Sequence, residues 1–129
     1  MDEIILELPY PPSVNHYYKT VRTRKSLIMY IDQKGIDYRN KVKEIIIENK
    51  VKNCHPFHLP YFPLARLSAK FYVYPPDKRC RDLDNLGKVL LDSLQHALVY
   101  YNDNQIDQLY FERLDVIKGG KVTAIIKAI

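Results

Sequence analysis

The stretch Leu67–Leu98, LSAKFYVYPPDKRCRDLDNLGKVLLDSLQHAL, decides the fold. Its first residues alternate between apolar and polar side chains, which predicts a half-buried strand with an apolar face of Leu67, Ala69, Phe71 and Val73. Pro75 and Pro76 end this strand because proline donates no ladder hydrogen bond. From Asp82 to about Leu98, apolar residues recur at helical spacing, and they are Leu83, Leu86, Leu90, Leu94 and Ala97. The stretch therefore predicts a strand, a basic turn and a helix that opens with two carboxylates.

The rest of the chain predicts further strands and one more helix. The strands are Glu3–Leu8, Ile106–Asp115 and Lys121–Ala128, and Gly119 and Gly120 form the turn before the last of them. Apolar residues at helical intervals predict an amphipathic helix from Gly35 to about Lys50, whereas Tyr10–Ser26 and Asn53–Pro63 are expected to be loops. We therefore expect the α+β fold class, as a single two-layer domain with a small mixed sheet of about four strands and two principal helices.

Length and composition limit the possible classes of protein. A chain of 129 residues suits one domain. With 47% hydrophobic and 27% charged residues, the chain is neither wholly disordered nor a collagen or coiled coil. No apolar run reaches the roughly 18 residues of a membrane span, and the start MDEII lacks the pattern of a signal peptide, so we expect a cytoplasmic protein with no membrane partner. The two cysteines form no Cys-x-x-Cys pair, which indicates neither a disulfide framework nor a zinc ribbon.

The charges are unevenly distributed along the chain. The formal net charge is +5, which favours an anionic partner. Residues Lys19–Lys52 hold ten basic and four acidic side chains, whereas Val99–Asp115 holds four acidic side chains and only Arg113 as a base. A basic surface around a small acidic centre suits an enzyme that uses a metal ion to act on a polyanion, because carboxylates are needed to hold the metal and would otherwise repel phosphate.

Two segments provide candidate contacts to DNA. The expected loop Tyr10–Ser26 combines tyrosines that can stack on bases with cations that can neutralise phosphates, and the basic turn before the second helix carries guanidinium groups suited to bidentate phosphate contacts. The candidate DNA-binding residues are Asn15, Tyr18, Lys19, Arg22, Arg24, Lys25, Arg79 and Arg81. The alternatives remain open: a flexible surface loop, an asparagine that only forms a turn beside prolines, and solvated turn charges.

Three carboxylates form the candidate catalytic centre. Asp82 and Asp84 open the second helix, and Asp103 stands on the turn that leads back to the sheet. If they converge, they offer the hard oxygen ligands that magnesium prefers, with Lys88 as an ammonium near the phosphate. Phosphodiester hydrolysis then becomes plausible, because a metal ion lowers the pKa of its bound water. The structural alternative is that Asp82 is a helix N-cap and that Asp84, Lys88 and Asp92 form a ladder of surface ion pairs.

The order of several short motifs resembles the RusA family of Holliday-junction resolvases. The motifs are Pro11-Pro12-Ser13-Val14-Asn15, Tyr38-Arg39, Asp82-Leu83-Asp84-Asn85 with Lys88, Asn102-Asp103 before Gln105, and the turn Gly119-Gly120. Each motif alone is weakly specific. Their order and spacing along most of the chain, taken together, are specific. The expected loop Asn53–Pro63 lies outside the resemblance.

The resemblance implies a homodimeric, magnesium-dependent endonuclease for which Mn²⁺ can substitute and which needs no small-molecule cofactor. Residues 1–129 would form a single RusA-like endonuclease domain that acts in recombination and repair, nucleoid-associated through its DNA substrate. It would bind four-way junctions and nick two strands of like polarity near the crossover. The family's essential acids map onto Asp82, Asp84 and Asp103, and its catalytic lysine maps onto Lys88. Family members commonly carry two adjacent aspartates where this chain has Asn102 and Asp103, so we infer that Asp103 is the ligand and that Asn102 is dispensable as one.

Three functions remain open from the sequence. The first is the junction-resolving endonuclease. The second is a binding module for junctions or other branched DNA, with weak or no nuclease activity, in which the acids only cap a helix; the uncharged Asn102 favours it. The third is a metal-dependent nuclease that prefers flaps, replication forks or single strands. Cleavage of a synthetic junction titrated with magnesium or manganese, with a linear duplex as control, separates them.

Overall fold

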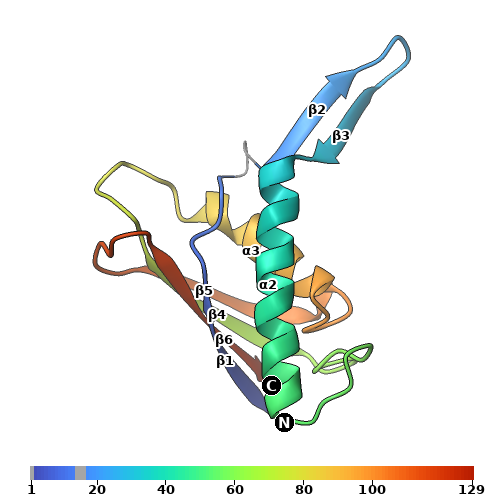
Figure 1. The fold of residues 1–129 in the computed structure, drawn as a ribbon, viewed down its shortest axis with the longest axis vertical. Helices are drawn as coiled ribbons and strands as arrows, with labels where there is room; N and C mark the ends of the chain where they lie inside the picture. Colours follow the sequence, from blue (N-terminus) through green and yellow to red (C-terminus); the bar gives the residue numbers. More distant parts are fainter. Residues whose placement is uncertain (1, 14–16) are drawn as a thin grey trace.

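A computed structural model describes residues 2–13 and 17–129. The elements follow one another in the order β1 (Glu3–Leu8), β2 (Tyr18–Arg22), β3 (Leu27–Ile31), α2 (Gln33–Lys52), β4 (Leu67–Tyr74), α3 (Asp84–His96), η1 (Asp103–Gln105), β5 (Ile106–Arg113) and β6 (Lys121–Ala128). Figure 1 shows a sheet, two helices packed over it, and a hairpin that extends beyond the rest of the molecule. In the portion of the chain thus described, no helix is long and apolar enough to cross a membrane.

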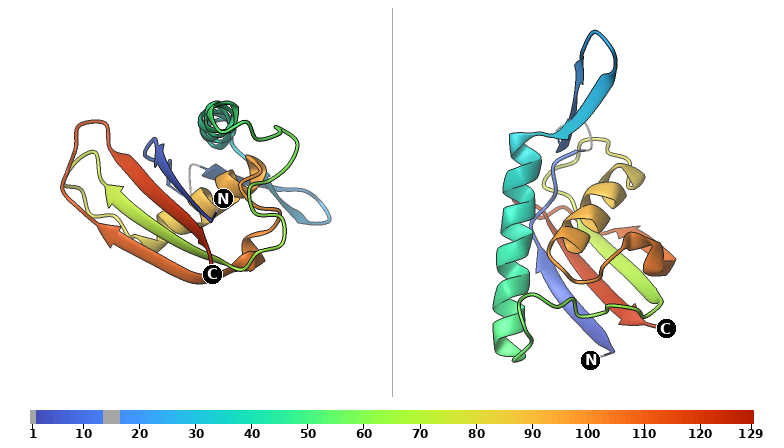
Figure 2. Two further views of the ribbon diagram at one scale, coloured as in Figure 1. Left: turned by 90° about the horizontal axis from the view of Figure 1, so that it is seen from below. Right: turned by 90° about the vertical axis from the view of Figure 1, so that its right-hand side faces the viewer.

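The main sheet has the strand order β1-β6-β4-β5. Strand β4 runs parallel to β5 and antiparallel to β6, and β6 runs antiparallel to β1, so the sheet is mixed. Both helices lie on the same face of the curved sheet (Figure 2). The parallel β4 and β5 are joined by the crossover that contains α3, because parallel neighbours cannot be joined by a tight turn. The predicted α+β class, with its mixed sheet and two principal helices, is confirmed.

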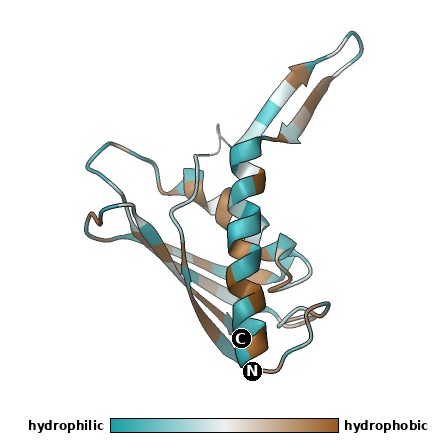
Figure 3. Ribbon diagram, viewed as in Figure 1, coloured by the Kyte–Doolittle hydropathy of each residue, from teal (hydrophilic) through white to brown (hydrophobic). Residues whose placement is uncertain are grey.

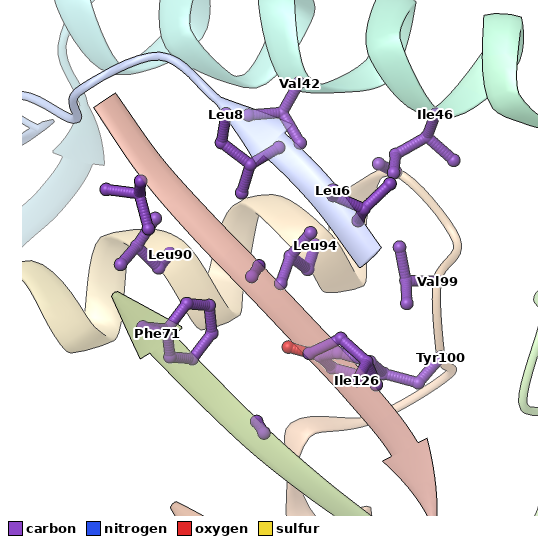
Figure 4. Packing of buried hydrophobic residues seen from close by; sticks show 14 of the residues in the cluster. Leu6, Leu8, Val42, Ile46, Phe71, Leu90, Leu94, Val99, Tyr100 and Ile126 are labelled. Atoms are coloured by element: carbon purple, nitrogen blue, oxygen red, sulfur yellow. The ribbon is translucent and has the colours of Figure 1, made fainter. Parts of the chain in front are cut away.

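The core lies between the two helices and the sheet. Side chains alternate between the two faces of a strand, so every second residue of β1, β4 and β6 is buried. Figure 4 shows how these residues meet the apolar sides of the helices, with Leu6 and Leu8 from β1, Val42 and Ile46 from α2, Phe71 from β4, Leu90 and Leu94 from α3, and Ile126 from β6. Each such side chain contributes about 1.5 to 3 kcal/mol when fully buried. The core therefore fixes α3, and with it the acidic segment, against β4.

The hairpin formed by β2 and β3 corrects the sequence-based prediction of a loop over Tyr10–Ser26. Its strands are antiparallel, with Tyr18 paired with Ile31 and Arg22 with Leu27. Residues 23–26 form the connecting turn, in which the Thr23 backbone N–H donates to the Ser26 carbonyl over 2.8 Å. We call residues 18–31 the arm, and Figures 1 and 3 show it projecting past the start of α2. The prediction was wrong because most of the arm is exposed on both faces, so its sequence lacks the alternation that marks a half-buried strand.

The predicted connection Asn53–Pro63 is confirmed as a segment of turns and bends without long strands or helices. Its anchor is Lys50, whose side chain is 1% exposed at the end of α2. The ammonium donates to the carbonyl of Leu59 over 2.9 Å and to that of Phe57 over 3.3 Å, and burial lowers the pKa of this group. The amphipathic pattern of the helix does not reveal this role of Lys50, because the hydrogen-bond partners of its ammonium are backbone carbonyls of the following loop.

Candidate active site

Asp82 and Asp84 lie together where the chain enters α3. Both line an open hollow of about 670 Å³ whose other walls are Cys80, Arg81, Leu83 and Arg113. The structural alternative in which Asp82 is the N-cap of this helix is wrong, because Leu83 occupies the N-cap position and no side chain caps this end. Asp84 lies in the first turn, where the positive end of the helix dipole stabilises a carboxylate. Both side chains are exposed and able to accept a cation.

A second hollow connects the acids to the start of the chain. It encloses about 280 Å³ and is lined by Tyr10 and Ser13 together with Asp82 and Asn85. The proline-serine segment and the aspartate motif are some 70 residues apart in the sequence, yet here they form one surface. Asn15, a predicted DNA contact in this segment, lies outside the described residues.

The basic turn before α3 is held by its own acidic residue. The Arg81 guanidinium donates to the Asp77 carboxylate over 2.7 Å, and the Arg79 backbone N–H donates to it over 2.9 Å. These two hydrogen bonds hold the pKa of Asp77 far below its usual range. Arg81 also stacks over the ring of Tyr10, 5.7 Å from its centre. Of the two predicted phosphate contacts, Arg81 is thus held in place, while Arg79 pairs with Asp77 through Nε over 3.3 Å and keeps 81% of its side chain exposed.

Asp103 lies at the start of η1, beside the other end of α3. Its backbone N–H donates to the side-chain carbonyl of Gln95 over 3.0 Å. Asn102 caps η1 by accepting from the backbone of Asn104 over 3.0 Å, while the Gln105 side chain accepts from the backbone of Asn102. The amide of Asn102 therefore has a structural task in this chain that does not require a charge.

The three acids are aligned along α3 but do not meet within one chain. Asp84, Lys88 and Gln95 share one face of the helix, and Gln95 holds Asp103 at the far end of that face. Gln95 lies eleven positions after Asp84, which corresponds to about 16 Å of helix, whereas ligands of one magnesium ion lie within about 4 Å of one another. Across residues 2–13 and 17–129, no group of three or more His, Cys, Asp or Glu side chains lies close enough to hold a metal ion.

The donor set still fits magnesium in part. Magnesium is usually held by one or two carboxylates and completes its shell with water and substrate phosphate. Asp82 and Asp84 supply two hard oxygen ligands in an open hollow bordered by guanidinium groups. The residues present therefore suit such an ion, with Asp103 as a third ligand only if it is brought nearer. The full ligand set remains a prediction.

Lys88 and Asp92 contact other side chains rather than each other: Lys88 meets Tyr18 of the arm, and Asp92 meets Tyr17 and Arg39. The Lys88 ammonium lies 4.8 Å from the centre of the Tyr18 ring, a cation–π contact. Asp92 accepts hydrogen bonds from the Tyr17 hydroxyl and from Arg39, whose Nη2 is 2.5 Å from it. The ion-pair ladder that the sequence suggested is thus replaced by contacts that join the root of the arm to α3.

Tyr17, Arg39 and Asp92 form a network that sequence reasoning missed. Burial and the hydrogen bond to Asp92 raise the pKa of Tyr17 to about 12. Arg39 donates through Nε to the Tyr17 hydroxyl over 2.6 Å, and its neighbour Tyr38 donates to the carbonyl of Pro9 over 2.8 Å. The motif Tyr38-Arg39 is the only trace of this network in the local sequence, and it does not reveal the partner of Arg39, because Asp92 lies 53 residues away in the chain.

The remaining predicted DNA contacts lie on the arm. Lys19 and Arg22 belong to β2, and Arg24 and Lys25 belong to the turn at its tip. An acidic hollow with a cationic border is what an enzyme needs to hold a cation and a nucleic-acid phosphate side by side. Together with the α+β fold, this arrangement places the chain in the class of small nucleases.

Comparison with known proteins identifies the family within that class. The sequence model described as Endodeoxyribonuclease RusA matches residues 9–127. A relative from Enterobacteria phage HK97, named as a crossover junction endodeoxyribonuclease, is 39% identical over 122 residues, which span 95% of this chain and 92% of the relative. Relatives of the same name from Shigella sonnei and Escherichia coli are 33% and 32% identical with the same coverage. The chain belongs to the RusA family of endodeoxyribonucleases.

Proposed function

We propose that this protein is a magnesium-dependent endodeoxyribonuclease that resolves four-way DNA junctions by paired, symmetric nicks. The observation that carries the proposal is the pair Asp82 and Asp84 in one hollow with Arg81 and Arg113. The relatives named as crossover junction endodeoxyribonucleases support the choice of a junction as substrate. The net charge of +5 supports binding to a polyanion.

The acidic residues of the site would bind the metal ion, and the basic residues would bind the phosphates of the DNA. Asp82 and Asp84 would hold the metal ion, and Asp103 would complete its ligands. The ion, when bound, supplies a water of lowered pKa and stabilises charge on the reacting phosphate. Lys88 would lie near that phosphate, and Arg79 and the cations of the arm would hold the backbone of the DNA on either side.

The direct test replaces each acid by its amide. We expect Asp82→Asn, Asp84→Asn and Asp103→Asn to abolish cleavage of a synthetic four-way junction in magnesium, because an amide is a poor magnesium ligand. Junction binding should survive, and it should strengthen because a negative charge facing phosphate is removed. The control is Asp107→Asn. Asp107 lies on β5, and its exposed carboxylate pairs with Arg66. Full cleavage by any of the three variants would remove that residue from the site.

A homodimer is part of the proposal, because two-fold symmetry provides two identical sites for two symmetric cuts. It also offers a way to unite the acids, since the Asp103 backbone is held at Gln95, about 16 Å of helix beyond Asp84 in one chain. Mixing the Asp84→Asn and Asp103→Asn proteins tests this. If one site draws Asp84 and Asp103 from different subunits, the mixed dimer regains one intact site and nicks one strand. If each site draws both acids from one chain, the mixture stays inactive and η1 must move toward the start of α3.

A binding module without catalysis is the second candidate, and the uncharged Asn102 favours it. Wild-type protein that binds the junction but does not nick it in either magnesium or manganese would establish this function. Faster cleavage of flaps, forks or single strands than of four-way junctions would instead establish a nuclease with another substrate. A linear duplex serves as the control for both measurements.

A further inference from the structure

The arm exposes more apolar surface than a ribbon in water would be expected to carry. Along its strands, side chains are exposed by 60% at Leu27, 57% at Met29, 50% at Ile28 and 47% at Val21. Figure 3 colours much of β3 as hydrophobic, although this strand projects away from the core. A two-stranded hairpin is only marginally stable by itself in water. These side chains therefore call for a surface that covers them.

The pairing of the strands divides the arm into two faces. Residues directly opposite in an antiparallel pair lie on the same face, and the pairs alternate between the two faces. The face that we call the inner face consists of Tyr18, Thr20, Arg22, Leu27, Met29 and Ile31. The outer face consists of Lys19, Val21, Ile28 and Tyr30.

The inner face is continuous with the candidate active site. At the root of the arm, Tyr18 and Ile31 pack against the core, and the ring of Tyr18 lies 4.8 Å from the Lys88 ammonium. Beyond them on the same face come Met29 and then Leu27, both exposed. A molecule that is bound at Lys88 can therefore extend along the inner face of the arm without passing to the outer face.

The charge of the arm indicates what covers it. Residues 17–31 include four basic side chains, at Lys19, Arg22, Arg24 and Lys25, and no acidic one. A polyanion complements this charge, whereas a second copy of the same basic arm would be repelled by it. Nucleic acid also offers apolar surface, because base pairs expose their faces wherever stacking is interrupted.

We propose that the inner face of the arm docks on the base pairs exposed at the branch point of the DNA. Leu27 and Met29 cover the base faces, and Arg22 contacts a flanking phosphate. This inference rests on the proposed junction substrate and adds the apolar contact that distinguishes a branch point from continuous duplex, in which stacked neighbours hide the base faces. It assigns recognition of the branch to side chains that carry no charge.

Matched double variants of the two faces test the proposal. Leu27→Thr with Met29→Thr alters the inner face, and Val21→Thr with Ile28→Thr alters the outer face with the same number of apolar side chains removed. Threonine retains strand propensity, and none of the four residues is buried in the core. The measurement is binding, in EDTA to prevent cleavage, to a four-way junction that carries 2-aminopurine at the branch point, with a linear duplex as control.

We expect the inner variant to bind the junction about tenfold or more weakly, with loss of the 2-aminopurine signal seen for wild type. The outer variant should stay within about twofold of wild type, and duplex binding should change little in either variant. Because no charge changes, the dependence of junction affinity on salt should keep its slope, whereas Arg22→Gln should reduce that slope by about one. Equal affinity of the inner variant and wild type would overturn the proposal, as would equal loss in the two double variants.

Two further results keep this proposal distinct from the proposed function. Wild-type protein that does not bind the junction would overturn both, whereas junction binding and cleavage unaffected by the inner variant would overturn only the role of the arm. A DNA-free dimer that dissociates in the inner variant would show that a second copy covers this face instead. If a variant fails to fold, photocrosslinking of wild type to 5-bromouracil at the branch point replaces it. Crosslinked peptides should then include Leu27 or Met29, and crosslinks confined to other segments would refute the contact.

Discussion

Two carboxylates on the same helix serve different purposes because their surroundings differ. Asp84 lies exposed in an open hollow at the start of α3, where a cation can reach it. Asp92, two turns further on, is half-buried and accepts hydrogen bonds from Tyr17 and Arg39. Spacing alone does not separate these roles, since both residues lie on the polar side of the helix. At the scale of the residue, the partners decide the role.

The first residue-scale prediction concerns Asp92→Asn. We expect this change to lower the free energy of unfolding by about 1 to 3 kcal/mol, because it removes the charge that pairs with Arg39 in a partly buried site. Chemical denaturation of the purified protein measures it. The matched control is Asp107→Asn, whose ion pair with Arg66 is exposed and should have no measurable effect. Equal effects of the two changes would show that burial of the Asp92 pair does not matter.

The second residue-scale prediction concerns Tyr17 and pH. Because the pKa of Tyr17 is raised to about 12 in the folded state, above its ordinary value near 10, this residue stabilises the fold below about pH 10 and loses that contribution as the pH rises toward 12. The expected loss is about 1 to 3 kcal/mol. Unfolding of wild type and Tyr17→Phe at several values between pH 8 and 12 should show a difference in stability that shrinks with rising pH. A constant difference would contradict the raised pKa.

At the scale of the element, the joint between the arm and α2 is a close contact. Gly35 lies in the first turns of α2, next to Ile31 and Tyr17 at the root of the arm. A side chain at this position would meet the Ile31 Cγ2 atom at 2.7 Å and the Tyr17 backbone oxygen at 2.8 Å. The direction in which the arm leaves the body therefore depends on a close approach that only glycine permits.

We expect Gly35→Ala to destabilise the protein although alanine favours a helix by about 1 kcal/mol over glycine. The added methyl group meets a backbone atom, which cannot move without displacing the arm. Gly87→Ala is the matched control, because its methyl group would meet only the ring of Phe111, at 3.0 Å, on an edge strand. Thermal unfolding should show a lower Tm for the first variant and little change for the second. Equal behaviour of the two would show that the joint tolerates a side chain.

At the scale of the whole molecule, the proposed dimer gives a direct prediction. A chain of 15.2 kDa should sediment as a species of twice that mass in the absence of DNA. Chelation of divalent ions should leave both this mass and the Tm unchanged, because the core consists of apolar side chains and not of metal ligands. Analytical ultracentrifugation measures the mass, and thermal unfolding measures the Tm, each in magnesium and in EDTA. A monomer at micromolar concentration would contradict the paired symmetric cuts.

Much of the fold could be predicted from the sequence. The bounds of β1, β4 and β6 match the predicted strands within a residue, because one face of each strand is buried and leaves an alternating pattern. Helix α3 has a clear apolar stripe, although it begins two residues later than predicted, at Asp84. The adjacency of Asp82 and Asp84 also follows from the sequence, since two residues separated by one position cannot lie far apart.

The sequence by itself determined the class of fold, the acidic start of α3 and the basic character of the molecule. These features are local, because burial on one face of an element leaves a periodic pattern in the residues of that element. Only the tertiary structure decided that residues 18–31 form a projecting arm, that Asp92 belongs to Arg39 and Tyr17, and that Asp103 lies at the far end of α3. These facts depend on distances between segments remote in the chain. Such distances are set by how helices and strands pack, which no single segment encodes.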